Sequence, residues 1–121
     1  MNEKDKAKVE NVIQDIGKVH SKMSERESYK SFLSFSHKTF SDNGAVSAKN
    51  KDLIAIGIAI AINCDPCVLF HIRNAFMHKA TEEEILEAIE IGYEMGGGPA
   101  VIKSSFAFKV LDYYNEFGKI Y

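Results

Sequence analysis

The sequence has few of the features that mark secreted, membrane-spanning or nucleic-acid-binding proteins. Only two of its 121 residues are cysteine, which is too few for a disulfide scaffold. Its formal charge is -2, and its longest run of like charge is Glu82–Glu84, so we expect no nucleic-acid partner. The longest apolar run, Leu53–Ile62, is about half of what a membrane span requires, so we expect no membrane insertion.

The amino-terminal stretch, MNEKDKAKVE, is charged from its third residue onward. It has neither the apolar core nor the small-residue cleavage site of a signal peptide, so we expect a cytoplasmic protein. In a reducing compartment, a close pair of cysteines indicates transient redox chemistry or metal binding rather than a permanent crosslink.

The chain also lacks internal repeats, low-complexity tracts and linkers rich in proline, glycine or serine. Its two prolines, Pro66 and Pro99, both stand where a helix could begin. A chain of 13.5 kDa is the size of one domain, so we expect residues 1–121 to form a single domain.

Apolar spacing and capping residues predict an all-α domain of five to six helices. Ser47 is a cap for a helix that ends near Ile62, and Thr81 with Glu84 forms a capping box for a helix that ends near Met95. Gly118 lies just beyond the last predicted helix. The predicted helices cover residues 9–19, 29–40, 48–62, 66–78, 81–95 and 100–117.

The segment LIAIGIAIAI, residues 53–62, allows a second interpretation. Its isoleucines alternate with small residues, which suits a buried strand, and a strand followed by CxxC and a helix would resemble thioredoxin. No other segment shows a convincing strand pattern, so we favour the helix. A helix that is apolar on every side must be covered all round, within the subunit or by another one, so we expect a homo-oligomer.

The stretch NCDPCVLFH, residues 63–71, carries the most chemistry. A helix that begins at Asp65 or Pro66 places Cys64 and Cys67 in or beside its first turn, where free N–H groups favour a thiolate. His71 follows Cys67 by four residues, so both side chains lie on one helix face and the imidazole could act as a base. Asp52, in the preceding helix, is the acid that could tune it.

Two simpler interpretations remain open. Zinc would need a fourth ligand, and no second CxxC or HxxxH supplies one, although His78 could be recruited. The cysteines could also be ordinary core residues. The histidines His20, His37 and His78 have no comparable neighbours in the sequence, and we interpret each as a surface or partly buried residue.

Residues 44–100 resemble the core of the carboxymuconolactone decarboxylase superfamily and, within it, the alkyl hydroperoxidase D branch. The resemblance rests on an acid, eleven residues, CxxC, three residues and a histidine, which here are Asp52, Cys64, Cys67 and His71. The lead-in at 49–55 and the AT-x-E-E-I that opens the following helix also agree. The family usually has Glu in place of Asp52, which is one methylene shorter.

The resemblance implies a helical fold that assembles as trimers or hexamers and acts as a thiol-dependent peroxidase or disulfide reductase. Cys67 would attack a small-molecule hydroperoxide, Cys64 would form the disulfide with it, His71 would be the base and Asp52 the relay acid. A dithiol donor such as a lipoyl protein would reduce the pair, and neither metal nor flavin is implied.

Two alternatives belong to other functional classes. The decarboxylase branch shares the fold but removes a carboxyl group from a lactone without a CxxC pair. A non-enzymatic oligomer could use the same thiols for redox sensing or structure. The family's usual Gly before AT is Lys79 here, which changes the helix end and not the chemistry.

Overall fold

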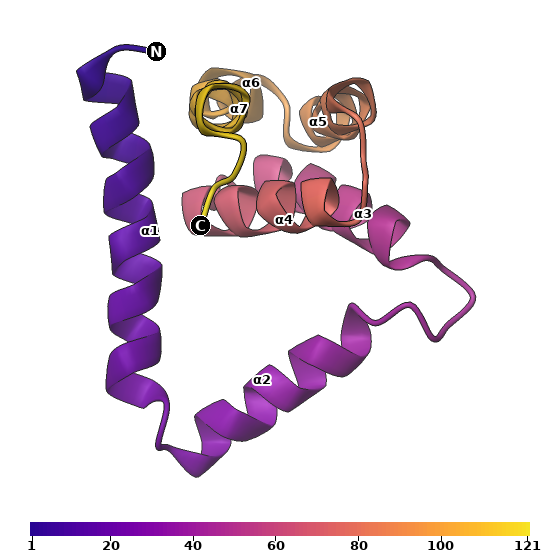
Figure 1. Ribbon diagram of the computed structural model, residues 1–121. Helices are drawn as coiled ribbons and strands as arrows, with labels where there is room; N and C mark the ends of the chain where they lie inside the picture. Colours follow the sequence, from indigo (N-terminus) through magenta and orange to yellow (C-terminus); the bar gives the residue numbers. More distant parts are fainter.

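The computed structural model describes all 121 residues, and every regular element in it is a helix (Figure 1). The predicted all-α fold is therefore confirmed, and the thioredoxin-like strand at 53–62 is wrong, since this segment lies in α3. The seven helices are α1 (Glu3–Met23), α2 (Glu27–Thr39), α3 (Ala48–Ala61), α4 (Asp65–Met77), α5 (Glu82–Gly96), α6 (Gly98–Lys103) and α7 (Ser105–Phe117).

The body of the molecule is built around α3 and α4. Helix α3 packs against both α4 and α5, while α4 also contacts α7, which lies above it in Figure 1, and α1, which stands at its left. The core consists of aliphatic side chains that these helices bury completely, including Ile56, Leu69, Ile72, Ile85 and Val110. This packing holds the carboxyl-terminal half of α3 beside the start of α4, where the cysteines lie.

Helices α3 and α5 cross so closely that their backbones are in contact. A Cβ atom added to Gly92 on α5 would lie 2.7 Å from the Cβ of Ile60 and 2.8 Å from the carbonyl oxygen of Gly57 on α3. No side chain fits at this crossing, so glycine is required there for packing rather than for a special backbone conformation.

The chain reverses sharply between α3 and α4. Asn63 adopts the left-handed conformation, with φ 60°, and the N–H of Cys64 donates to the carbonyl of Ala59 over 3.0 Å. Asparagine tolerates this conformation better than most residues, which ends α3 in a Schellman motif. Pro66 lies in the first turn of α4, as the sequence predicts, and the N-cap is Cys64.

The structure corrects the single helix predicted over 100–117. The chain forms α6 and α7 instead, and they meet at Ser104. The Ser104 hydroxyl donates to the carbonyl of Val101 over 2.7 Å and lies 2.6 Å from the Tyr93 hydroxyl. A serine that bonds back to its own helix bends it, so the buried polar side chain accounts for the break.

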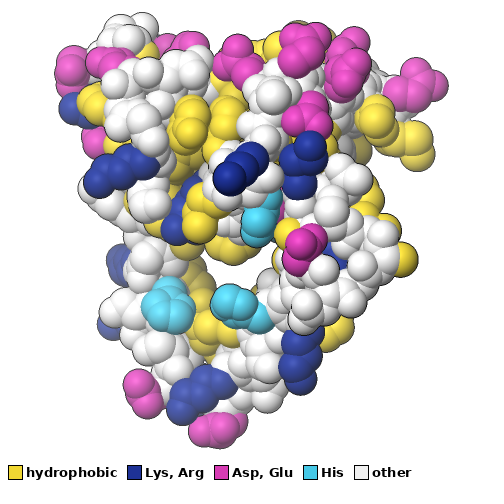
Figure 2. Space-filling view, turned by 45° about the vertical axis from the view of Figure 1, so that its right-hand side comes forward, with side chains coloured by type: hydrophobic (Ala, Val, Ile, Leu, Met, Phe, Trp, Pro, Cys, Tyr) yellow, Lys and Arg dark blue, Asp and Glu magenta, His cyan; other side chains and the backbone are white.

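The amino-terminal helices contribute little to the core. Helix α1 buries only Val9, and α2 buries no residue. In Figure 1, α2 runs beneath the body rather than against it, and the space-filling view shows an opening between the two (Figure 2). None of the helices is both long and apolar enough to cross a membrane.

Candidate functional site

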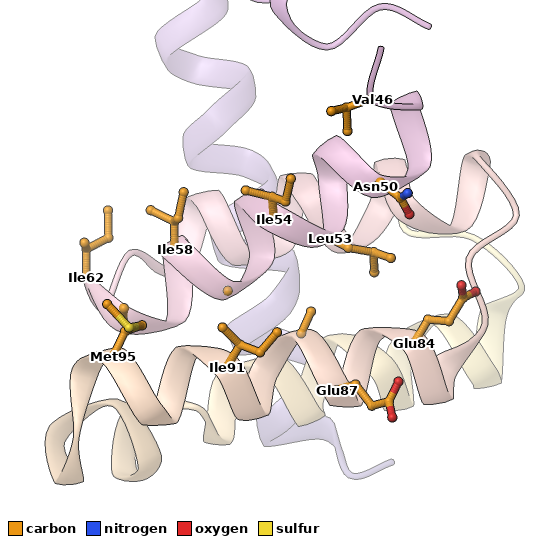
Figure 3. A pocket seen from close by; sticks show the side chains of 13 residues that line it. Val46, Asn50, Leu53, Ile54, Ile58, Ile62, Glu84, Glu87, Ile91 and Met95 are labelled. Carbon is orange, nitrogen blue, oxygen red and sulfur yellow. The ribbon is translucent and has the colours of Figure 1, made fainter. Parts of the chain in front are cut away.

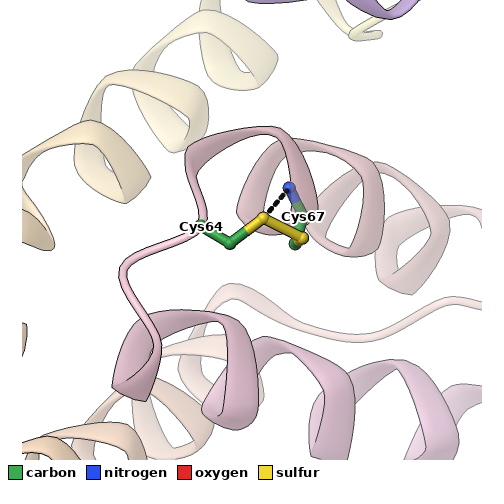
Figure 4. Close-up of a disulfide and its surroundings, with 2 residues drawn as sticks. All are labelled: Cys64 and Cys67. Atoms are coloured by element: carbon green, nitrogen blue, oxygen red, sulfur yellow. Dashed lines mark hydrogen bonds between the residues drawn. A yellow bond between two sulfur atoms is a disulfide. The ribbon is translucent and has the colours of Figure 1, made fainter.

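The two cysteines form a disulfide at the amino terminus of α4 (Figure 4). Their Cα atoms are 5.3 Å apart, and the N–H of Cys67 donates to the Sγ of Cys64 over 3.3 Å. Both residues are half-buried. The first turn of a helix has N–H groups without helical partners, and here one of them is directed at sulfur, which favours the thiolate when the bond is reduced.

His71 lies one helical turn after Cys67, with its side chain 15% exposed. Its Nδ1 is 3.2 Å from the Oδ1 of Asp52, and its ring lies against the rings of Phe40 and Phe70. A carboxylate accepts hydrogen bonds, so Nδ1 carries the proton in this contact and Nε2 is left to exchange one. The aromatic rings limit the orientations that the imidazole adopts.

Asp52 brings the acid to this histidine from α3. Its side chain is 1% exposed, and it reaches His71 directly although it is one methylene shorter than glutamate. A buried carboxylate is costly unless hydrogen bonds compensate it, and Asp52 has such a bond at each oxygen. The structure thus brings together the acid and the histidine that the sequence predicts as a pair.

The second bond to Asp52 comes from His78, which the sequence interpretation gave no partner. Its Nδ1 lies 2.9 Å from the Oδ2 of Asp52, and its side chain is 43% exposed. The surface or partly buried position expected for His78 is confirmed, whereas its contact with Asp52 was not predicted. His78 follows His71 by seven residues, which is close to two helical turns, and this spacing on α4 is the signal that could have identified it.

These residues lie in a segment that known proteins share. A model described as the carboxymuconolactone decarboxylase family matches residues 26–110, which include both cysteines, Asp52 and His71. The chain is also 41% identical over 78 residues to an uncharacterised protein of Cupriavidus necator, covering 64% of this chain and 69% of that protein. The chain belongs to the carboxymuconolactone decarboxylase family. The predicted resemblance to this superfamily is confirmed.

A second relative and a solved structure also match the chain. Uncharacterised protein 4 in the cox locus of Paracoccus denitrificans is 38% identical over 81 residues, which cover 67% of this chain and 72% of that protein. The crystal structure of an apo carboxymuconolactone decarboxylase family protein from Legionella pneumophila matches with a TM-score of 0.72 and 30% identity. That match covers 98% of this chain and 100% of the other.

Proposed function

We propose that this family member is a thiol-dependent peroxidase and disulfide oxidoreductase that reduces hydroperoxides through Cys64 and Cys67. One observation carries the proposal: the disulfide stands at the start of α4, one turn before an imidazole that a buried carboxylate binds. Membership of a family that includes enzymes supports it, as does the agreement with the alkyl hydroperoxidase D pattern.

The first step takes place at Cys67, which lies on the same face of α4 as His71. The reduced Cys67 thiol gives its proton to Nε2 of His71, and Asp52 stabilises the imidazolium that results. The thiolate attacks one peroxide oxygen and the O–O bond breaks. The leaving alkoxide takes a proton and departs as an alcohol, and Cys67 becomes a sulfenic acid.

The second step joins the two cysteines. The Cys64 thiolate attacks the sulfenic sulfur of Cys67, the S–S bond forms, and the hydroxyl group leaves with a proton as water. The Cα separation of 5.3 Å is within the range that disulfides require. An external dithiol, such as a lipoyl group on a partner protein, then returns two electrons and two protons by thiol–disulfide exchange.

This cycle needs no metal or flavin, because the cysteine pair carries both electrons. It does need a compartment in which the dithiol donor stays reduced, and the cytoplasm is such a compartment.

The test is peroxide consumption by the full chain with a dithiol such as dihydrolipoamide. The wild type should turn over repeatedly. Cys67→Ser should abolish consumption, while Cys64→Ser should accumulate a sulfenic acid that a sulfenic-acid-specific reagent traps. Full activity in either variant contradicts the mechanism. Oxidation of the wild type once, without turnover, would instead indicate a redox sensor.

A further inference from the structure

His78 is the second partner of Asp52, and it lies outside the acid, CxxC and histidine pattern that defines the candidate site. We propose that His78 is a positioning residue: it holds the Asp52 carboxylate so that Oδ1 faces His71. The proposal rests on the proposed function only where a reaction rate is measured, because the position of the carboxylate is also reported by the protonation of the His71 ring.

The geometry assigns each carboxylate oxygen one donor. Oδ1 of Asp52 is 3.2 Å from His71, and Oδ2 is 2.9 Å from His78; no other hydrogen bond reaches this side chain. The last torsion of an aspartate side chain is soft, so one bond to His71 alone would not fix the carboxylate plane. Two bonds from imidazoles on the same helix fix it.

The end of α4 holds His78 in place for this role. His78 is the C-cap of α4, and the next residue, Lys79, is left-handed, with φ 67°. The N–H of Ala80 donates to the carbonyl of Ala75 over 2.9 Å, and the N–H of Lys79 donates to that of Phe76 over 2.9 Å. These bonds form a Schellman motif, so the backbone at His78 is well constrained.

Removal of the His78 imidazole leaves Oδ2 without its protein donor. The loss of one hydrogen bond to a charged group corresponds to a rate change of about 10- to 100-fold when the bond supports the transition state. We therefore expect His78→Ala to slow oxidation of the reduced protein by a hydroperoxide to this extent. His78→Asn keeps an N–H donor close to the position of Nδ1 and should stay within a few-fold of the wild type.

The test has a second readout that does not depend on activity. Imidazole 15N NMR of the full chain reports which ring nitrogen of His71 carries the proton. We expect the Nδ1–H form in the wild type and in His78→Asn, and a mixture of both forms in His78→Ala. His37→Ala removes an exposed imidazole on α2 and serves as the control that should change neither readout.

The outcomes separate the two proposals. A wild type that peroxide does not oxidise would overturn the peroxidase, while the NMR result would still test His78. An unchanged His71 tautomer in His78→Ala overturns the positioning role even if the rate falls. If His78→Asn is as impaired as His78→Ala, a hydrogen-bond donor is not what this position supplies.

A separate observation concerns helix α2, which touches its own chain only near its ends: Tyr29 lies 3.3 Å from His20 of α1, and Phe40 lies against His71. It has thirteen residues, none of them buried, and Phe32 and Phe35 on it are 62% and 66% exposed. A helix of this length is marginal in water unless an apolar face packs against something. The exposed face of α2 therefore needs a cover that the rest of the subunit does not provide.

The body carries an open apolar groove between α3 and α5 (Figure 3). It has a volume of about 890 Å³. Figure 3 shows Ile54, Ile58 and Ile62 in a row along α3, with Ile91 and Met95 on α5, and these five side chains are 56% to 77% exposed. Residues 53–62 were predicted to need cover on every side; α4 and α5 cover two of these sides, and the side that faces the groove is open.

We infer that the groove receives α2 of a second copy of this chain. Two lysines and one glutamate give α2 a net charge of +1, whereas six glutamates and no base give α5 a net charge of -6. Figure 2 shows acidic side chains gathered along the upper part of the molecule, where α5 to α7 lie. Pairing groove against groove would bring two such surfaces together, so the charges favour α2 as the occupant.

A contact between different surfaces of two copies is heterologous, and it closes into a ring when the rotation allows. This agrees with the homo-oligomer expected from the sequence, and a trimer is a closed ring of this type. Phe40, the C-cap of α2, packs against His71 with 4.8 Å between ring centroids, so the same helix also borders the candidate site.

Sedimentation velocity of the full chain and two exposed-site variants tests this arrangement. The wild type should be an oligomer, whereas Phe35→Glu in α2 and Ile58→Glu in the groove should each be a monomer of 13.5 kDa. Phe108→Glu changes an exposed apolar side chain on α7, outside both surfaces, and should remain oligomeric. Circular dichroism checks that each variant is folded.

A mixture of the two monomeric variants gives the decisive result. Phe35→Glu keeps an intact groove and Ile58→Glu keeps an intact α2. One α2–groove interface can therefore form between the two variants, and the mixture should contain dimers. A chain with both substitutions should stay monomeric. A monomeric wild type, an oligomeric Phe35→Glu variant, or a mixture without dimers each overturns the proposal.

Discussion

Asp52→Asn tests the proton relay with little change in side-chain volume. The carboxylate accepts one bond from His71 over 3.2 Å and one from His78 over 2.9 Å. An amide offers one oxygen and one NH2 group, so one of the two imidazoles then faces a donor with its own N–H. If that imidazole is His71, its proton moves to Nε2, the nitrogen that must accept the thiol proton.

The expected change in rate follows from the loss of a correctly protonated base at His71. A well-placed general base contributes about 10²- to 10⁴-fold to a rate, so we expect thiol oxidation to slow by roughly 10²-fold at neutral pH. The disulfide should still form, because the cysteines are untouched. Leaving one buried hydrogen-bonding group unsatisfied should also lower the free energy of unfolding by about 1–3 kcal/mol.

The assay is stopped-flow loss of free thiols from the reduced protein after mixing with an organic hydroperoxide, repeated across the neutral pH range. Asp112→Asn, an exposed position on α7, is the matched control and should react like the wild type. A folded Asp52→Asn protein with an unchanged rate at every pH would remove Asp52 from the relay.

Three further predictions concern stability. Gly92→Ala should lower the free energy of unfolding, measured in urea, by about 1–3 kcal/mol, because its Cβ would overlap α3. Gly17→Ala is the control: nothing lies within 4 Å of its Cβ, so it should raise the free energy of unfolding by about 0.5–1 kcal/mol. Equal effects of the two substitutions would contradict the close packing of α3 and α5. Lys79→Gly should raise the free energy of unfolding by about 1 kcal/mol, because glycine adopts the left-handed conformation of residue 79 without strain. A lower free energy of unfolding would show that the lysine side chain itself stabilises the turn. The backbone N–H of Thr81 bonds Glu84 and lowers its pKa, so this carboxylate stabilises the fold above the ordinary carboxyl pKa and less as pH falls through the lowered one. Glu84→Gln should therefore be less stable than wild type near pH 7 and equal to it in acid, and a pH-independent difference would refute the assignment.

Much of the site was predictable because short-range rules determine it. Ser47 caps α3, and Thr81 and Glu84 form the capping box of α5, each as local sequence indicates. Helical spacing alone places His71 one turn after Cys67. The residues alone suggested Asp52 as the acid for His71, and the family resemblance added its role as relay acid; their contact itself depends on the angle between two helices, which is not encoded locally.

The features that the sequence did not reveal depend on tertiary packing. His78 has an unremarkable neighbourhood in sequence, and it becomes a partner only because α3 lies across α4 and brings Asp52 between two turns. The break at Ser104 depends on a hydroxyl that lies against Tyr93 from another helix. The exposure of α2 could not be predicted either, because amphipathic spacing is the same whether a helix packs within one subunit or against another.

The most direct test of the proposed cysteine chemistry is the intact mass and free-thiol count of the reduced protein before and after one equivalent of an organic hydroperoxide. We expect loss of both thiols and of the mass of two hydrogen atoms, with Cys64 and Cys67 joined. Two thiols that remain free in the folded protein would contradict it, and the family fold would then be present without the proposed chemistry.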